Sequence, residues 1–198
     1  MLNRMTAVLL FSLTLITSGC GASTMKTPDI KQNPNPKMRY EITMTVDGAP
    51  EPFDSINGYV VYEVVNDACV PLQPGSGARL APEKSLPLEF TRQGNVFKGA
   101  FYADQLQDED YFGLGVCHWG IASAGANPKV HNYSFDLGIT TDAIRAGKSE
   151  VIYFTKKAFL EAASHGGDHD GGTVRTDYVA QHPQEFFSIT IEAREGVK

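Results

Sequence analysis

The sequence has few of the features that mark several large classes of protein. Its 17 Lys and Arg are outnumbered by 23 Asp and Glu, and the formal net charge is −6. Proteins that bind the phosphate backbone need clustered basic side chains, so a nucleic-acid partner is not expected. The N-terminal apolar run, residues 7–16, is about half as long as a membrane-spanning helix. The composition, 42% hydrophobic and 20% charged, is typical of a globular chain.

Motifs of catalysis are also missing. The chain contains no G-x-S-x-G elbow, no H-E-x-x-H and no P-loop. Ser76 lies in the stretch PGSGAR, where Pro and Gly indicate a loop rather than a strand–turn–helix. We therefore expect a protein that is not an enzyme and that needs no cofactor.

The first residues are typical of a targeting segment. Arg4 precedes the apolar run, and the small residues Ser18 and Gly19 follow it before Cys20. The stretch Thr17-Ser18-Gly19-Cys20 resembles the lipobox of bacterial lipoproteins, L-[AS]-[GA]-C, with Thr in the place of Leu. The alternative is an ordinary secretory peptide that is cut one or two residues later, so that Cys20 is lost.

The resemblance to bacterial lipoproteins has several implications. Residues 1–19 would be a signal peptide that is removed, and Cys20 would carry acyl chains, palmitate among them, that hold the protein on a membrane. Gly21 follows the cysteine, and no Asp stands there to retain the protein at the inner membrane. The implied location is the outer membrane, facing the periplasm. Arg4 is removed with the signal peptide, so the side-chain charge changes from −6 to −7.

The segment after Cys20 is polar and lacks apolar periodicity. It contains Pro28, Pro34 and Pro36, which is typical of a linker. We expect residues 20–37 to form the lipidated cysteine and a flexible tether, and residues 38–198 to form one domain.

Two cysteines remain for the domain once Cys20 is assigned to the lipid. Cys69 and Cys117 can pair, because the cell envelope is oxidising. The alternative is two buried free thiols. Without a Cys-x-x-Cys motif, a catalytic role is not expected.

From residue 39 the apolar pattern has a period of two, which indicates β-strands. Strands are expected at residues 39–47, 58–65, 86–90, 96–103, 111–119, 133–139, 150–155 and 186–193. Short helices are expected at residues 141–145 and 156–164, with Thr141 and Thr155 as their caps. Asp47-Gly48 indicates a turn and Gln93-Gly94-Asn95 a hairpin. The glycine-rich and alanine-rich stretches, residues 121–128 among them, are expected to be loops. The predicted fold class is all-β, an immunoglobulin-like antiparallel β-sandwich with one or two short helices; a small antiparallel barrel is the alternative.

Two groups of residues are candidates for binding. Asp108, Glu109 and Asp110 form an acidic cluster, which is either a solvated turn or part of a binding surface. Trp119 is either a core residue packed near a disulfide or an anchor in an interface.

The segment from His165 to Asp170 is a candidate metal site. His165, Asp168, His169 and Asp170 are residue types that bind Zn²⁺ or Ni²⁺. A polar glycine-rich surface loop explains the same residues.

The mature domain resembles, on few residues, the periplasmic lipoproteins that act as immunity proteins against type VI secretion effectors. The residues concerned are the stretches YEITMTVDGAP and DEDYFGLGVCHW with Cys69 and Cys117. The resemblance implies a non-catalytic, lipid-anchored envelope protein that binds and inhibits a secreted antibacterial effector. The alternatives are a structural or accessory outer-membrane lipoprotein and a metal-binding periplasmic lipoprotein.

Overall fold

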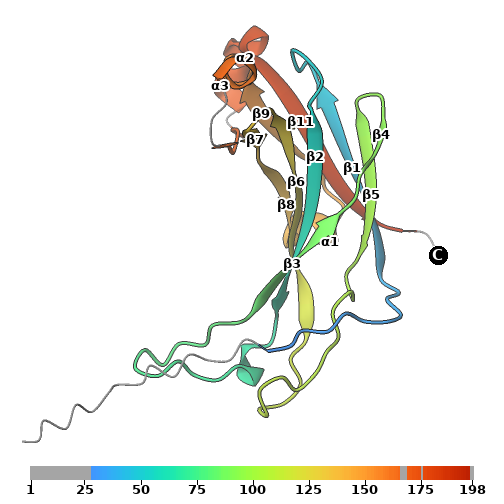
Figure 1. Cartoon of the computed structure of the whole chain (residues 1–198), viewed down its shortest axis with the longest axis vertical. Coiled ribbons are helices and arrows are strands. Elements are labelled where there is room, and N and C mark those ends of the chain that lie inside the picture. The colour runs from blue at the N-terminus through green and yellow to red at the C-terminus, as the bar shows by residue number, and fades with distance from the viewer. Residues whose placement is uncertain (1–27, 166–168, 175, 197–198) are drawn as a thin grey trace, which may run out of the picture.

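The protein is a β-sandwich of two sheets in the computed structural model, which describes residues 28–165, 169–174 and 176–196 (Figure 1). The first sheet has the order β4-β5-β1-β11-β9. Its strands are β1 (Arg39–Asp47), β4 (Thr91–Gln93), β5 (Val96–Tyr102), β9 (Glu150–Thr155) and β11 (Phe186–Glu195). All its strand pairs are antiparallel.

The second sheet has the order β10-β7-β6-β2-β3, and β8 also pairs with β6. Its strands are β2 (Ser55–Val64), β3 (Glu83–Leu88), β6 (Trp119–Val130), β7 (Tyr133–Phe135), β8 (Leu137–Thr140) and β10 (His169–Asp170). β10 pairs with β7 in parallel, whereas the other pairs are antiparallel. The predicted antiparallel sandwich is thus confirmed as the fold class.

The apolar residues that alternate along the strands are buried and form the core, as expected. In β1, Ile42 and Met44 are fully buried, and they lie opposite Ala193 and Ile191 of β11. An aromatic cluster fills one end of the space between the sheets, made of Phe53, Phe135, Phe154, Phe159 and Phe187. Such ring pairs add to the stabilisation that burial alone provides.

Tyr62 connects the two sheets across the core. Its ring is 1% exposed, and its hydroxyl donates a hydrogen bond of 2.7 Å to the carbonyl oxygen of Tyr102 in the opposite sheet. Burial, and secondarily the charge of Asp104, raises the pKa of Tyr62 above its ordinary value. The phenol is therefore held in its neutral form, which can donate this bond.

The predicted strand at residues 111–119 is wrong. The structure has a loop from residue 111 to residue 118, and β6 begins at Trp119. Gly113 and Gly115 have φ angles of 73° and 106°, which lie outside the β region. The turn at Asp47-Gly48 and the hairpin at Gly94, in contrast, form where they were expected, with positive φ at both glycines.

The predicted loop at residues 121–128 is also wrong, because this segment is the middle of β6. The strand is rich in Ala and Gly since its neighbours leave no room for larger side chains. A Cβ atom on Gly125 would lie 2.3 Å from the carbonyl oxygen of Leu137 and 2.5 Å from the hydroxyl of Tyr59. Close approach, rather than a turn, explains these small residues.

The helices are short. α1 (Thr141–Ala146) is capped by Thr140, one residue earlier than Thr141, and it ends at Gly147. α2 (Lys156–His165) begins after Thr155, whose hydroxyl accepts a hydrogen bond of 3.1 Å from the Ala158 amide, as predicted. α3 (Thr176–Gln181) and the 3₁₀ turns η1 (Asp67–Cys69) and η2 (Pro183–Glu185) were not predicted.

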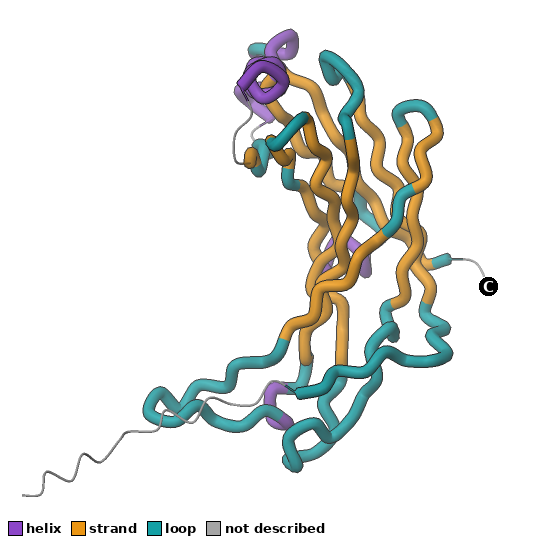
Figure 2. The backbone as a smooth tube through the Cα atoms, in the orientation of Figure 1, coloured by secondary structure: helices purple, strands orange, loops and turns teal. Residues whose placement is uncertain are grey.

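The sandwich has two different ends (Figure 2). α2 and α3 lie at one end, and long loops lie at the other, where the described part of the chain also begins. Among the described helices, none is long and apolar enough to cross a membrane.

Candidate binding site

Most of the predicted site residues meet at the end of the sandwich that carries the long loops. Residues 65–82 connect β2 to β3 there, and residues 103–118 connect β5 to β6. We call this region the loop end. It holds Asp108, Glu109, Asp110, Cys117 and Trp119, together with Cys69, which precedes Cys117 by 48 residues.

A disulfide joins the two loops. Cys69 in η1 and Cys117 just before β6 are bonded, with a Cα–Cα distance of 5.3 Å, within the usual range. Both cysteines are buried, and the predicted bridge is confirmed. In a strand, Cys117 would lie on the same face as Gly113 and Gly115. Residues 111–118 form a loop instead, so the side chain of Cys117 is free to point toward Cys69.

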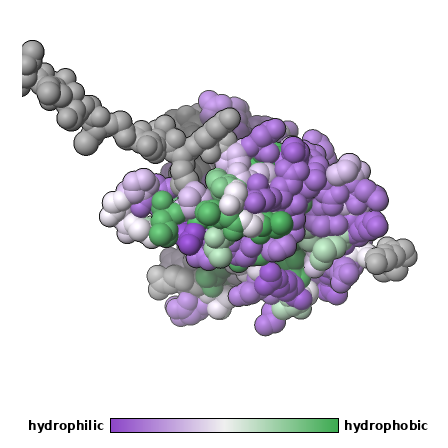
Figure 3. Space-filling view, turned by 90° about the horizontal axis from the view of Figure 1, so that it is seen from below, coloured by the Kyte–Doolittle hydropathy of each residue, from purple (hydrophilic) through white to green (hydrophobic). Residues whose placement is uncertain are grey.

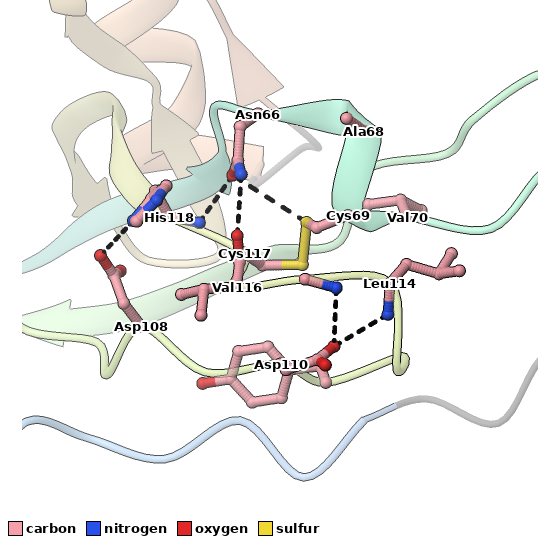
Figure 4. Close-up of a disulfide and its surroundings, with 12 residues drawn as sticks. Asn66, Ala68, Cys69, Val70, Asp108, Asp110, Leu114, Val116, Cys117 and His118 are labelled. Atoms are coloured by element: carbon pink, nitrogen blue, oxygen red, sulfur yellow. Dashed lines mark hydrogen bonds and ion pairs between the residues drawn. A yellow bond between two sulfur atoms is a disulfide. The ribbon is translucent and has the colours of Figure 1, made fainter.

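Asn66 ties the same loops together by side-chain hydrogen bonds (Figure 4). Its Nδ2 donates to the carbonyl oxygen of Val116 at 2.8 Å, and its Oδ1 accepts from the amide of His118 at 2.6 Å. The amide group therefore satisfies one backbone acceptor and one backbone donor on either side of Cys117. Sequence patterns alone did not indicate this residue.

The acidic cluster shapes the loop end through its hydrogen bonds. Asp108 accepts from the Trp119 amide at 3.0 Å and contacts Nδ1 of His118 at 2.6 Å. Asp110 accepts from the amides of Leu114 at 3.0 Å and Gly115 at 3.2 Å. These bonds fix the glycine-containing turn that replaces the predicted strand.

Glu109 faces the N-terminal segment instead. Its carboxylate bonds Nζ of Lys31 at 3.0 Å, and this contact raises the pKa of Lys31. The backbone adds hydrogen bonds from Asn33 N to Gln105 O and from Gln107 N to Lys31 O, at 2.8 and 2.9 Å. The second half of the expected tether is thus bonded to the loop end, whereas Cys20 and the signal peptide lie outside the described residues.

A pocket opens at the loop end between the two sheets. We call it the sheet mouth; its volume is about 700 Å³. Its lining comes from β1 (Tyr40), β6 (Trp119, Gly120, Ile121), α1 (Thr141, Ile144, Arg145), the 103–108 loop, Val65 and the N-terminal residues Asn33, Pro34 and Met38. A small ligand or a side chain of a partner could occupy such a space.

Trp119 borders the sheet mouth as a buried residue. It is 9% exposed, and its ring packs edge-on against Tyr111 with centroids 6.3 Å apart. The core interpretation of this residue therefore agrees with its burial. Its indole Nε1 is buried and has no acceptor among the described residues, which is costly for a polar atom.

Apolar side chains are exposed around these loops, and Figure 3 shows apolar patches on this face. Leu72 and Leu80 belong to one loop, and Leu114 and Val116 to the other; they are 56%, 63%, 53% and 46% exposed. A strand at residues 111–119 would place Leu114 and Val116 on one side together with Phe112, but their segment is a loop.

The predicted metal site is only partly within the described residues. Asp168 and the side chains of His165 and His169 lie outside them. Asp170 accepts a hydrogen bond of 2.7 Å from the Gly172 amide. Within the part of the chain that the structure describes, no group of three or more His, Cys, Asp or Glu could hold a metal ion.

Comparison with known proteins gives no relative. No known protein family, curated protein or solved structure matches this chain.

Proposed function

We propose that this chain is a lipid-anchored protein of the bacterial envelope that binds another protein through its loop end. The observation that carries the proposal is the group of exposed apolar side chains on two loops that a disulfide holds together. Leu72 and Leu80 are exposed on one of these loops, and Leu114 and Val116 on the other. Exposed apolar side chains on restrained loops are what the core of an interface uses.

Rigidity favours binding in a specific way. The disulfide and the Asn66 bonds restrain the loops before a partner arrives. Loops that are already ordered lose less conformational entropy on association. The loop end is therefore suited to bind a partner without first refolding.

Charge indicates the chemistry of the partner. Asp67, Asp108 and Asp110 are exposed at the loop end, and the whole chain has a net charge of −6. The partner surface that fits is an apolar patch with basic side chains around it, because complementary charge accelerates association and favours the correct partner. An antibacterial effector with a basic active-site rim meets this description, in line with the resemblance to immunity lipoproteins.

The test uses site-specific cross-linking in the native envelope. A photo-reactive amino acid is placed at Leu114 in the full chain, and at Leu160 of α2 as a control; each leucine is 53% exposed, but they lie at opposite ends of the molecule. We expect one discrete protein adduct from position 114 and none from position 160. Equal adducts from the two positions, or none from position 114, would contradict binding through the loop end.

Function and anchoring are then tested separately. The double variant Leu114→Ser/Val116→Ser is expected to abolish the adduct made from a reporter at Leu72, while Leu160→Ser leaves it unchanged. Labelled palmitate should be incorporated into the parent chain and not into Cys20→Ser. A chain that incorporates no label in the parent form is not a lipoprotein, whatever it binds.

A further inference from the structure

The N-terminal segment is attached to the domain at the loop end, before the first strand begins. Lys31 is ion-paired with Glu109 at 3.0 Å. Nδ2 of Asn33 donates a hydrogen bond of 2.9 Å to the carbonyl oxygen of Asp104. β1 starts only at Arg39. The point at which the chain first meets the domain is therefore the 103–109 loop, at the end of the sandwich opposite α2 and α3 (Figure 1).

The proposed anchor lies close to this contact along the chain. Lys31 follows Cys20 by 11 residues, and a chain of that length spans at most about 40 Å when fully extended. Glu109 therefore stays within about 50 Å of the anchored cysteine in every orientation of the domain, once the two paired side chains are included. β2 and β11 are each 10 residues long, so the end with α2 is about 33 Å away from the loop end.

So short a connection restricts which partners use the loop end efficiently. A freely diffusing protein has to enter the thin layer beside the membrane and dock on the side of the domain nearest the anchor. A protein that is itself attached to the membrane is already in that layer. Two groups confined near one surface meet at a high effective concentration, which raises the apparent affinity without any new contact.

Charge separates a protein partner from the lipid bilayer itself. Surfaces that bind bilayers directly surround their apolar residues with Lys and Arg. The two loops, residues 65–82 and 103–118, contain five Asp and Glu but a single Lys or Arg, which is Arg79. Its guanidinium donates to the carbonyl oxygens of Ala68 and Val70, so it is committed within its own loop. The loop end thus suits a basic protein surface better than anionic lipid headgroups.

We propose that the partner of the loop end is a protein attached to the same membrane as the Cys20 anchor, with basic side chains around an apolar centre. The exposed apolar side chains of the two loops contact that centre, and the exposed carboxylates of Asp67, Asp108 and Asp110 face its Lys and Arg. This inference rests on the proposed function, both on the anchor and on binding through the loop end, and adds where the partner resides.

The length of the tether provides the first test. The photo-reactive amino acid is placed at Leu114 in the parent chain and in a chain with a Gly/Ser insertion of about 30 residues between Ala22 and Ser23. Effective concentration falls roughly as the −3/2 power of tether length, so at low expression we expect about sevenfold less adduct from the longer chain. The same insertion after Lys198 is the matched control and should leave the yield unchanged.

A released form of the chain provides the second test. Residues 1–20 are replaced by an ordinary cleavable secretory signal, so that the chain from Gly21 onward carries no lipid, and the probe again stands at Leu114. We expect its adduct to sediment with the membranes and to need detergent for extraction. The released chain without a cross-link should not float with protein-free vesicles of phosphatidylethanolamine and phosphatidylglycerol.

Three results would overturn the inference. They are an adduct of the released chain in the soluble fraction, an adduct yield that does not depend on tether length, and flotation with the vesicles, which would identify the bilayer as the occupant. Failure of the proposed function is distinguishable from these, because it appears as the absence of any adduct at Leu114 in the unmodified parent chain.

Discussion

Removal of the disulfide tests the energetic basis of the loop end. Cys69 and Cys117 are separated by 48 residues, and the chain-entropy treatment of a loop of this length gives about 4 kcal/mol, the upper end of what such bridges contribute. β2 and β6 also pair through backbone hydrogen bonds up to Val64 and Trp119, so we expect the sandwich to persist in the reduced protein. We expect Cys69→Ala/Cys117→Ala to lower the free energy of unfolding by about 2–4 kcal/mol.

The assay is urea unfolding of the full chain, followed in parallel by Trp119 emission and by far-ultraviolet circular dichroism. Trp119 lies two residues after Cys117, so its emission reports on the loop end, while circular dichroism reports on the sheets. Cys20→Ala is the control and should not change either midpoint. A loss below about 1 kcal/mol in the double variant would refute the reasoning, because the entropy of the unfolded chain would then not be what the bridge removes.

Three further changes probe individual contacts. Gly125→Ala should destabilise the fold by about 1–3 kcal/mol in urea unfolding, because its Cβ would overlap the Leu137 carbonyl; Gly171→Ala, with open space around it, should be nearly neutral. Because the pKa of Tyr62 is raised in the folded protein, its neutral hydroxyl stabilises the fold fully below about pH 10, and this contribution is lost as the pH rises further. Tyr62→Phe should therefore reduce the loss of unfolding free energy at alkaline pH, and an unchanged dependence on pH would contradict this reasoning. Asp104→Asn should increase hydrogen exchange at the amides of residues 37 and 38, whose acceptor it weakens; unaltered protection would show that the carboxylate does not hold them.

The parts of the fold that the sequence predicts are those with strong local patterns. The alternation from Tyr40 to Val46 marks β1, and Thr155 marks the start of α2, because burial and capping are decided within a few residues. The turn at Gly94 is equally local. In each of these cases the tertiary structure agrees with the local preference.

The parts that the sequence does not predict depend on distant contacts. β6 contains Gly125 because Tyr59 and Leu137 approach it from neighbouring strands, and nothing in residues 121–128 reveals those neighbours. The loop at residues 111–118 has alternating apolar residues, but the Asp110 bonds and the disulfide hold it in a turn. The sheet mouth is formed by five separate segments, so Arg145 could not be assigned to it in advance.

The contact between the N-terminal segment and the 103–109 loop has a mechanical consequence. Any tension on an N-terminal anchor reaches the domain first at Lys31 and Asn33, which are bonded to Glu109 and Gln105. Beyond these contacts the backbone continues directly into β1 at Arg39, the central strand of the first sheet. The bonds at Lys31 and Asn33 would therefore have to break before such tension reached β1 along the backbone.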